Sequence, residues 1–303
     1  MRQRQPPVRW IAGLLGALAL LAVLAAAVWV PRALRVHRIE RDELRWSAPP
    51  DAPPAPPAGI DGLVETHWTL ADATRQRAFY APGTSGCVLV VVHGSPGTAL
   101  GMLPQARALA RRGHGVLLVD LPGYGGSEGA RTWGAAARAS LRAAVDFAAA
   151  QPGVRAIAGY GYSMGTSVLA QAAADDARIG TIVLLAPFTD FASQRAAQHR
   201  SRVPGMGAVA VLSARWLGLA VDELDTSRAL RRLGDRPLLL VAGDADRAVP
   251  LAMVRRLKAL AENAELWVLP GAGHVDVAQT TDDAFLHHVH AFLLRNLGDT
   301  VSP

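Results

Sequence analysis

Gly161-Tyr162-Ser163-Met164-Gly165 stands between an apolar run at 154–158 and a helical pattern at 166–174. A serine with glycines two residues before and after it, at a strand-to-helix turn, is typical of a nucleophile elbow. The glycines allow the sharp turn and the close approach of neighbouring chain segments. Ser163 is therefore the predicted nucleophile, an ordinary helix N-cap being the alternative, and the Met164 N–H is a predicted oxyanion donor at the helix N-terminus.

The chain around this turn alternates apolar runs with helical patterns. The predicted strands are 64–70, 76–80, 87–92, 116–119, 154–158, 179–185, 238–241 and 266–269. The runs are short and rich in Val, Leu and Ile, and helical patterns such as 104–112 and 137–148 lie between them. Such alternation predicts an α/β fold with a mostly parallel sheet covered by helices on both faces. Ligands are then expected at the carboxyl ends of the strands.

A serine hydroxyl needs a base, and the base needs an orienting acid. His274 follows the last predicted strand in a Gly-Ala-Gly-His loop, and it is the predicted base. Asp246 lies in the loop after the strand at 238–241 and is the predicted acid, with Asp244 as its competitor. Loop carboxylates that cap the next helix are the structural alternative for both.

The loop after the strand at 87–92 reads His93-Gly94-Ser95-Pro96-Gly97. Ser95 precedes a proline, which biases it to an extended conformation, and its backbone N–H is the predicted second oxyanion donor. A merely tight turn with a structural His93 is the alternative.

These motifs, at 93–97, 120–127, 161–165, Asp246 and His274, together resemble the α/β-hydrolase superfamily. The N-terminal apolar segment and the compact domain resemble membrane-anchored abhydrolase-domain proteins. That resemblance implies a serine hydrolase acting on a carboxylic ester or thioester of a small acyl or lipid-like substrate through an acyl-enzyme, with no metal or organic cofactor. The open alternatives are an aminopeptidase or amidase of the S33 type and an inactive membrane-tethered interaction module.

The N-terminus predicts a membrane anchor. Residues 1–9 form a short basic tail, and residues 10–30 contain no charged side chain. As a helix this segment would be about 31 Å long, the thickness of a bilayer core. A signal peptide cleaved near Ala25-Ala26-Ala27 is the alternative. The number of positive charges that flank the segment is the same on its two sides, so the positive-inside rule favours neither orientation. The short tail favours a single-pass anchor with an exported catalytic domain.

The remaining chain divides at a proline-rich stretch. Residues 31–58 are predicted to be a juxtamembrane segment and extended linker, and residues 59–303 to be one hydrolase domain. A small cap is expected at about 188–226. Its apolar residues include Leu212, Trp216, Leu217 and Leu219. They are predicted to pack on the domain, to line an acyl pocket as a lid over Ser163, or to dip towards the membrane.

Composition excludes several other classes. The chain has a net charge of +6, with Lys258 as its single lysine, and its arginines are scattered rather than gathered in a stripe with aromatics, which argues against nucleic acid. Cys87 has no partner for a disulfide and is expected to be buried. His287, His288 and His290 include one pair at i, i+3 helical spacing, but with no third ligand in sight they are expected to lie on a solvated helix face rather than in a metal site. Asp120 is expected to brace its loop.

Overall fold

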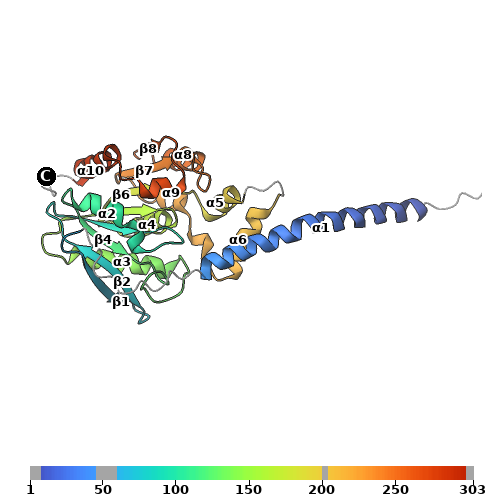
Figure 1. Cartoon of the computed structure of the whole chain (residues 1–303), viewed down its shortest axis with the longest axis horizontal. Helices are drawn as coiled ribbons and strands as arrows, with labels where there is room; N and C mark the ends of the chain where they lie inside the picture. Colours follow the sequence, from blue (N-terminus) through green and yellow to red (C-terminus); the bar gives the residue numbers. More distant parts are fainter. Residues whose placement is uncertain (1–7, 46–59, 200–203, 298–303) are drawn as a thin grey trace, which may run out of the picture.

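The computed structural model of the chain describes residues 8–45, 60–199 and 204–297. A sheet of eight strands lies at its centre, in the order β1-β2-β4-β3-β5-β6-β7-β8 (Figure 1). The strands are β1 (Val64–Thr69), β2 (Arg75–Ala81), β3 (Cys87–Val92), β4 (Gly115–Val119), β5 (Ala156–Tyr162), β6 (Ile179–Leu185), β7 (Leu238–Gly243) and β8 (Glu265–Leu269). β1 and β2 pair antiparallel at one edge, and the strands from β4 to β8 run parallel. The predicted α/β fold is confirmed.

Helices cover both faces of this sheet. One core packs α3 (Ala135–Ala149), α4 (Met164–Asp175) and α8 (Leu251–Leu260) on the first face. The other core packs α2 (Leu103–Ala110), α9 (His274–Gln279) and α10 (Asp283–Leu297) on the second, with the short helix η1 (Ala99–Met102) leading into α2. β3 is buried at every position because both of its faces are covered, which explains its continuous run of apolar residues.

β5 extends beyond its predicted end at Ala158 and leads directly into Ser163. The added residues include Gly159 and Gly161, which strand patterns disfavour. Here the glycines have a packing role: a Cβ on Gly159 would lie 2.7 Å from the Leu169 side chain of α4. Small residues on the strand let α4 lie close against it.

The segment between β6 and β7 forms the cap, with α5 (Phe191–Gln198), α6 (Met206–Trp216), η2 (Val221–Glu223) and α7 (Thr226–Leu230). Asp190 caps α5, since its Oδ1 accepts from the Ser193 N–H at 2.8 Å. Cys87 is buried, as expected.

The N-terminal helix, α1 (Val8–Arg45), projects from the domain at its C-terminal end, where α6 lies alongside it (Figure 1). It is long and apolar enough to cross a membrane. The predicted anchor segment spans residues 10–30, but the helix continues through Pro31 to Arg45. A proline inside a helix removes one backbone hydrogen bond. Next to Pro31, Arg32 Nη1 donates to the Val28 carbonyl at 2.9 Å.

The C-terminal half of α1, from Trp29 onwards, contacts the cap. Val36 is buried against Met206 and Ala210 of α6, and the Trp29 indole N–H donates to the Pro204 carbonyl at 3.2 Å. Residues 31–45 of the predicted linker at 31–58 are therefore helical. Residues 46–59, with the proline-rich stretch, lie outside the described residues.

Candidate active site

Ser163 lies at the turn between β5 and α4. Its φ of 49° and ψ of −120° are unusual for a residue with a side chain, as a strained nucleophile elbow requires. The Ser163 N–H donates to the Leu185 carbonyl of β6 at 2.9 Å, which holds the turn on the sheet. A Cβ on Gly165 would lie 2.4 Å from the His93 carbonyl oxygen, so only glycine fits after the turn.

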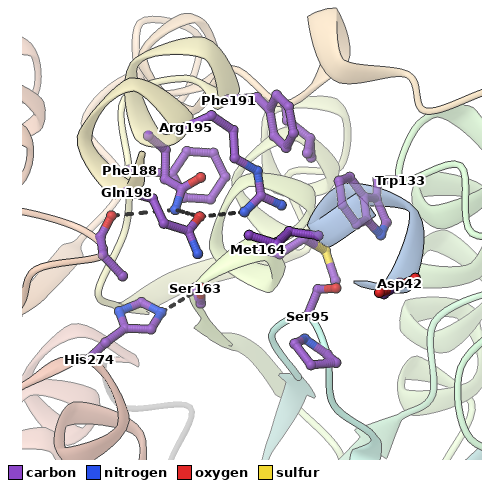
Figure 2. Close-up of a pocket in the computed structure, with 15 residues that line it drawn as sticks. Asp42, Ser95, Trp133, Ser163, Met164, Phe188, Phe191, Arg195, Gln198 and His274 are labelled. Carbon is purple, nitrogen blue, oxygen red and sulfur yellow. Dashed lines mark hydrogen bonds between the residues drawn. The ribbon is translucent and has the colours of Figure 1, made fainter. Parts of the chain in front are cut away.

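Ser163, His274 and Asp246 come together in a hydrogen-bonded chain beyond the carboxyl ends of β5, β7 and β8. His274 Nε2 lies 2.9 Å from Ser163 Oγ (Figure 2), and His274 Nδ1 lies 2.7 Å from Asp246 Oδ2. Because Nδ1 faces a carboxylate, which only accepts, the ring proton belongs on Nδ1. Nε2 is then free to accept the proton of the serine hydroxyl.

The two candidate acids have different partners. Asp246 is 5% exposed, and its Oδ1 accepts from the N–H groups of Ala248 and Val249, both at 2.8 Å. Its other oxygen is thereby directed at His274. Asp244 accepts instead from the Gly271 N–H at 2.7 Å, and so braces the loop that carries His274.

The two predicted oxyanion donors flank Ser163. Met164 is the first residue of α4, and both Met164 and Ser95 line the same cavity as Ser163 (Figure 2). Gly94 allows this approach, because a Cβ there would lie 3.1 Å from the Ser163 Cβ. The Ser95 hydroxyl lies 2.9 Å from the Tyr124 hydroxyl, which also accepts from the Trp133 indole at 2.6 Å.

His93 and Asp120 hold the surrounding loops. His93 is buried, its Nε2 accepts from the Leu121 N–H at 3.2 Å, and its Nδ1 lies 2.7 Å from the Gly94 carbonyl. Burial lowers the pKa of His93, which keeps the ring neutral in this role. Asp120 is fully buried and accepts from Arg77 and from the Ala99 N–H, each at 2.7 Å. The expectation that Asp120 braces its loop agrees with these contacts.

Tyr162, which the sequence analysis did not single out, supports His274. The Tyr162 hydroxyl donates to the His274 carbonyl at 3.1 Å, and the two rings lie 5.2 Å apart. Burial raises the pKa of Tyr162 above its ordinary value, so the hydroxyl stays a donor. Its place next to the nucleophile in the Gly-Tyr-Ser motif was the available signal.

A cavity of about 460 Å³ opens over Ser163 and His274. Aromatic and aliphatic side chains form much of its wall, and Gln194, Arg195 and Gln198 of α5 add polar groups. The lining residues are Ile39, Asp42, Ser95, Pro96, Trp133, Ser163, Met164, Phe188, Phe191, Gln194, Arg195, Gln198, Leu224, Ala248 and His274.

The cap contributes to this cavity through α5 rather than through the apolar face of α6. None of the four apolar residues named for a lid lines it. Trp216 is 78% exposed, with its ring tilted against that of His37 at a centroid distance of 5.4 Å, while Leu219 is buried in the domain. The lid interpretation of these residues is wrong, and packing on the domain is wrong for Leu212 and Trp216, which are 62% and 78% exposed. A position of these two side chains towards the membrane stays a prediction. The sequence analysis also missed Ile39 and Asp42, which α1 brings to the cavity wall.

Within 8–45, 60–199 and 204–297 no three His, Cys, Asp or Glu side chains come together. The histidines of α10 have other partners: His288 packs on Trp267 with ring centroids 3.7 Å apart, and His290 Nδ1 lies 2.9 Å from His114 Nε2.

Comparisons with known proteins agree with this architecture. Residues 88–206 match a family model for the alpha/beta hydrolase fold, and residues 211–298 match one for TAP-like proteins. An uncharacterised protein of Mycobacterium tuberculosis, found in strains CDC 1551 and H37Rv, is 32% identical over 252 residues, which cover 80% of this chain and 82% of the relative.

Solved structures share the fold at low identity. A Pyrococcus furiosus esterase is 21% identical with a TM-score of 0.68, covering 84% of this chain and 100% of the esterase. A membrane phospholipase A, described as a bacterial virulence factor, is also 21% identical, with a TM-score of 0.58, and covers 95% of this chain and 99% of its own.

A parallel sheet with a serine on a strained turn, facing a histidine from the loop after the last strand, defines a hydrolase of the α/β type. The sequence matches agree with this assignment. The chain belongs to the α/β-hydrolase superfamily.

Proposed function

We propose that this protein is a membrane-anchored serine hydrolase that cleaves a carboxylic ester or thioester of an acyl, lipid-like substrate. The observation that carries the proposal is the chain from Ser163 Oγ to His274 Nε2, 2.9 Å, and from His274 Nδ1 to Asp246 Oδ2, 2.7 Å, at the floor of a largely apolar cavity.

In the proposed acylation step, His274 Nε2 takes the Ser163 proton as Oγ attacks the substrate carbonyl carbon. The carbonyl oxygen becomes an oxyanion that the N–H groups of Met164 and Ser95 stabilise. Asp246 stabilises the imidazolium that forms. Collapse of the tetrahedral intermediate breaks the bond to the leaving group, which receives the proton from His274 Nε2.

In the proposed deacylation step, a water molecule replaces the leaving group. His274 removes one proton from the water as its oxygen attacks the acyl carbon. The ester bond to Ser163 Oγ then breaks, the proton returns to Oγ, and the carboxylic acid leaves.

The substrate class is inferred from the cavity and from the anchor. Trp133, Phe188 and Phe191 offer apolar surface next to Ser163, which suits an acyl chain. A helix that is long and apolar enough to cross a membrane would hold this cavity near lipid. The names of the esterase and the membrane phospholipase A with this fold are in keeping with such a substrate.

We further propose that α1 is a retained single-pass anchor and that the catalytic domain is exported. Arginines flank the apolar segment on both sides, so the orientation is decided by experiment. Protease added to spheroplasts, from which any outer membrane has been removed, should digest the domain. Protection until the inner membrane is lysed would place the domain in the cytoplasm.

The catalytic proposal is tested with a fluorophosphonate probe and a substrate panel on the full-length protein in detergent. Ser163 should be labelled in the wild type and unlabelled in Ser163→Ala, and labelling should be strongly slowed in His274→Ala. Absence of wild-type labelling would favour an inactive interaction module on the same fold. Turnover of aminoacyl amides in preference to esters and thioesters would favour the aminopeptidase alternative.

A further inference from the structure

The C-terminal turns of α1 form part of the catalytic cavity. Ile39 and Asp42 line the cavity that contains Ser163 and His274. Figure 2 shows Asp42 at this cavity. They reach it because α1 continues as a helix beyond Pro31 and packs on the cap. A helix that served only as a tether would have no reason to place side chains in the substrate cavity.

Glu40, on the same turns, is almost completely buried, with 1% of its surface exposed. A buried carboxylate is unfavourable unless charged or polar groups surround it. Glu40 Oε2 lies 3.4 Å from Arg195 Nε, and Glu40 Oε1 lies 3.1 Å from His199 Nε2. The arginine side chain is 5% exposed and the histidine side chain 10%, so water screens this cluster little.

Arg195 connects this cluster to the cavity wall. Its guanidinium carbon lies 4.8 Å from the centre of the Phe191 ring, a cation–π contact, and its Nη1 donates to Gln198 Oε1 (Figure 2). Arg195, Phe191 and Gln198 all line the cavity. The side chain that faces the substrate is therefore held from behind by a carboxylate of α1.

We propose that Glu40 is a positioning residue of the active site: from the end of the anchor helix it holds Arg195 against Phe191, and so sets the wall that receives the acyl chain. This inference rests on the proposed function. Substrate choice then depends on the docking of α1 on α5, and the anchor helix is a component of the catalytic unit.

The test measures chain-length preference in the full-length protein, as the ratio of kcat/KM for p-nitrophenyl decanoate to that for p-nitrophenyl butyrate. Glu40→Gln keeps the shape of the side chain and removes its charge. It should lower the ratio about tenfold, mainly through KM for the decanoate, since a displacement of 1 Å at a positioned group can cost about 100-fold. Arg38→Gln, an exposed charge on the same helix, is the matched control and should leave the ratio unchanged.

A double-mutant cycle keeps the inference testable if Glu40→Gln alone folds poorly, because Glu40→Gln with Arg195→Gln leaves neither charge of this ion pair buried alone. If Glu40 acts through Arg195, the double variant should have the ratio of Arg195→Gln alone. Additive effects, equal losses on both esters, or an unchanged ratio in Glu40→Gln would each overturn the inference.

A second readout separates failure of this inference from failure of the proposed function. Rates of Ser163 labelling by short-alkyl and long-alkyl fluorophosphonates give the same ratio without ester turnover. If wild-type Ser163 is labelled and the ratio is the same in Glu40→Gln, the inference alone is overturned. If wild-type Ser163 is not labelled, the proposed function is overturned, and the inference with it.

Discussion

Replacement of Asp246 by asparagine should stop catalysis by changing which nitrogen of His274 carries the proton. Asp246 Oδ1 accepts from two backbone N–H groups, of Ala248 and Val249, and Oδ2 accepts from His274 Nδ1. In the asparagine variant the amide oxygen should keep the two backbone donors, because an NH₂ group there would face both of them. The NH₂ group is then left to face His274 Nδ1.

A donor opposite Nδ1 makes that nitrogen the acceptor and moves the ring proton to Nε2. Nε2 would then donate to Ser163 Oγ, 2.9 Å away, and would be unable to remove its proton. In a serine protease triad the same change lowers kcat about 10⁴-fold, which is about 5 kcal/mol of transition-state stabilisation. We expect a loss of this size here, with little change in fold stability.

The assay compares kcat/KM for p-nitrophenyl butyrate and the rate of fluorophosphonate labelling in the wild type, Asp246→Asn and Asp244→Asn. Asp244 is a matched control, because it lies in the same loop and braces it through Gly271. Asp244→Asn should stay within about tenfold of the wild type, as expected when one loop hydrogen bond is weakened. Activity of Asp246→Asn within tenfold of the wild type, or equal losses in both variants, would refute the assignment.

Four further predictions concern the supports of the site. Gly165→Ala should abolish Ser163 labelling and lower the free energy of unfolding by about 1–3 kcal/mol, because its Cβ would lie 2.4 Å from a backbone oxygen; a folded, fully labelled variant would contradict this. Asp120→Ala should destabilise the domain by about 3–5 kcal/mol in urea unfolding, since it leaves Arg77 buried without its carboxylate. Burial lowers the pKa of His114 to about 4. Its neutral form therefore adds stability that is fully present above about pH 6.5 and is lost towards about pH 4, by about 3 kcal/mol, and His114→Asn should flatten this slope. Trp216→Ser should leave the chain-length ratio within about twofold of the wild type, as expected for an exposed side chain outside the cavity.

The sequence was most informative where a local pattern coincides with a strict backbone requirement. The elbow at Ser163 needs glycine at 165, because a Cβ there would lie 2.4 Å from the His93 carbonyl oxygen. The second glycine of the Gly-x-Ser-x-Gly motif reports this requirement. Strand β5 was predicted too short for the complementary reason. Gly159 is needed because the Leu169 side chain of α4, ten residues further along the chain, packs against it. The residue pattern of a single strand contains no signal for a contact with another element.

The lid interpretation was wrong because apolar character alone does not say which face of a helix meets the cavity. Leu212 and Trp216 are four residues apart and lie on one face of α6, 62% and 78% exposed. The same helix buries Met206 and Ala210 against α1. Because α6 packs along α1 in this way, the helix face with Leu212 and Trp216 does not line the cavity over Ser163.

Glu40 lies on the face of α1 that packs on the rest of the molecule. Ala33, Val36, His37 and Glu40 follow the spacing of one helix face, and Pro31 does not interrupt it. Along that face the exposed fraction falls to 6% at Val36 and 1% at Glu40. When an acidic residue lies on the buried face of a helix, its charge needs a buried cation as a partner. Arg195 of α5, which lines the catalytic cavity, is that cation. Glu40, which the sequence analysis assigned to a juxtamembrane linker, is therefore the residue that we propose joins α1 to the wall of the active site.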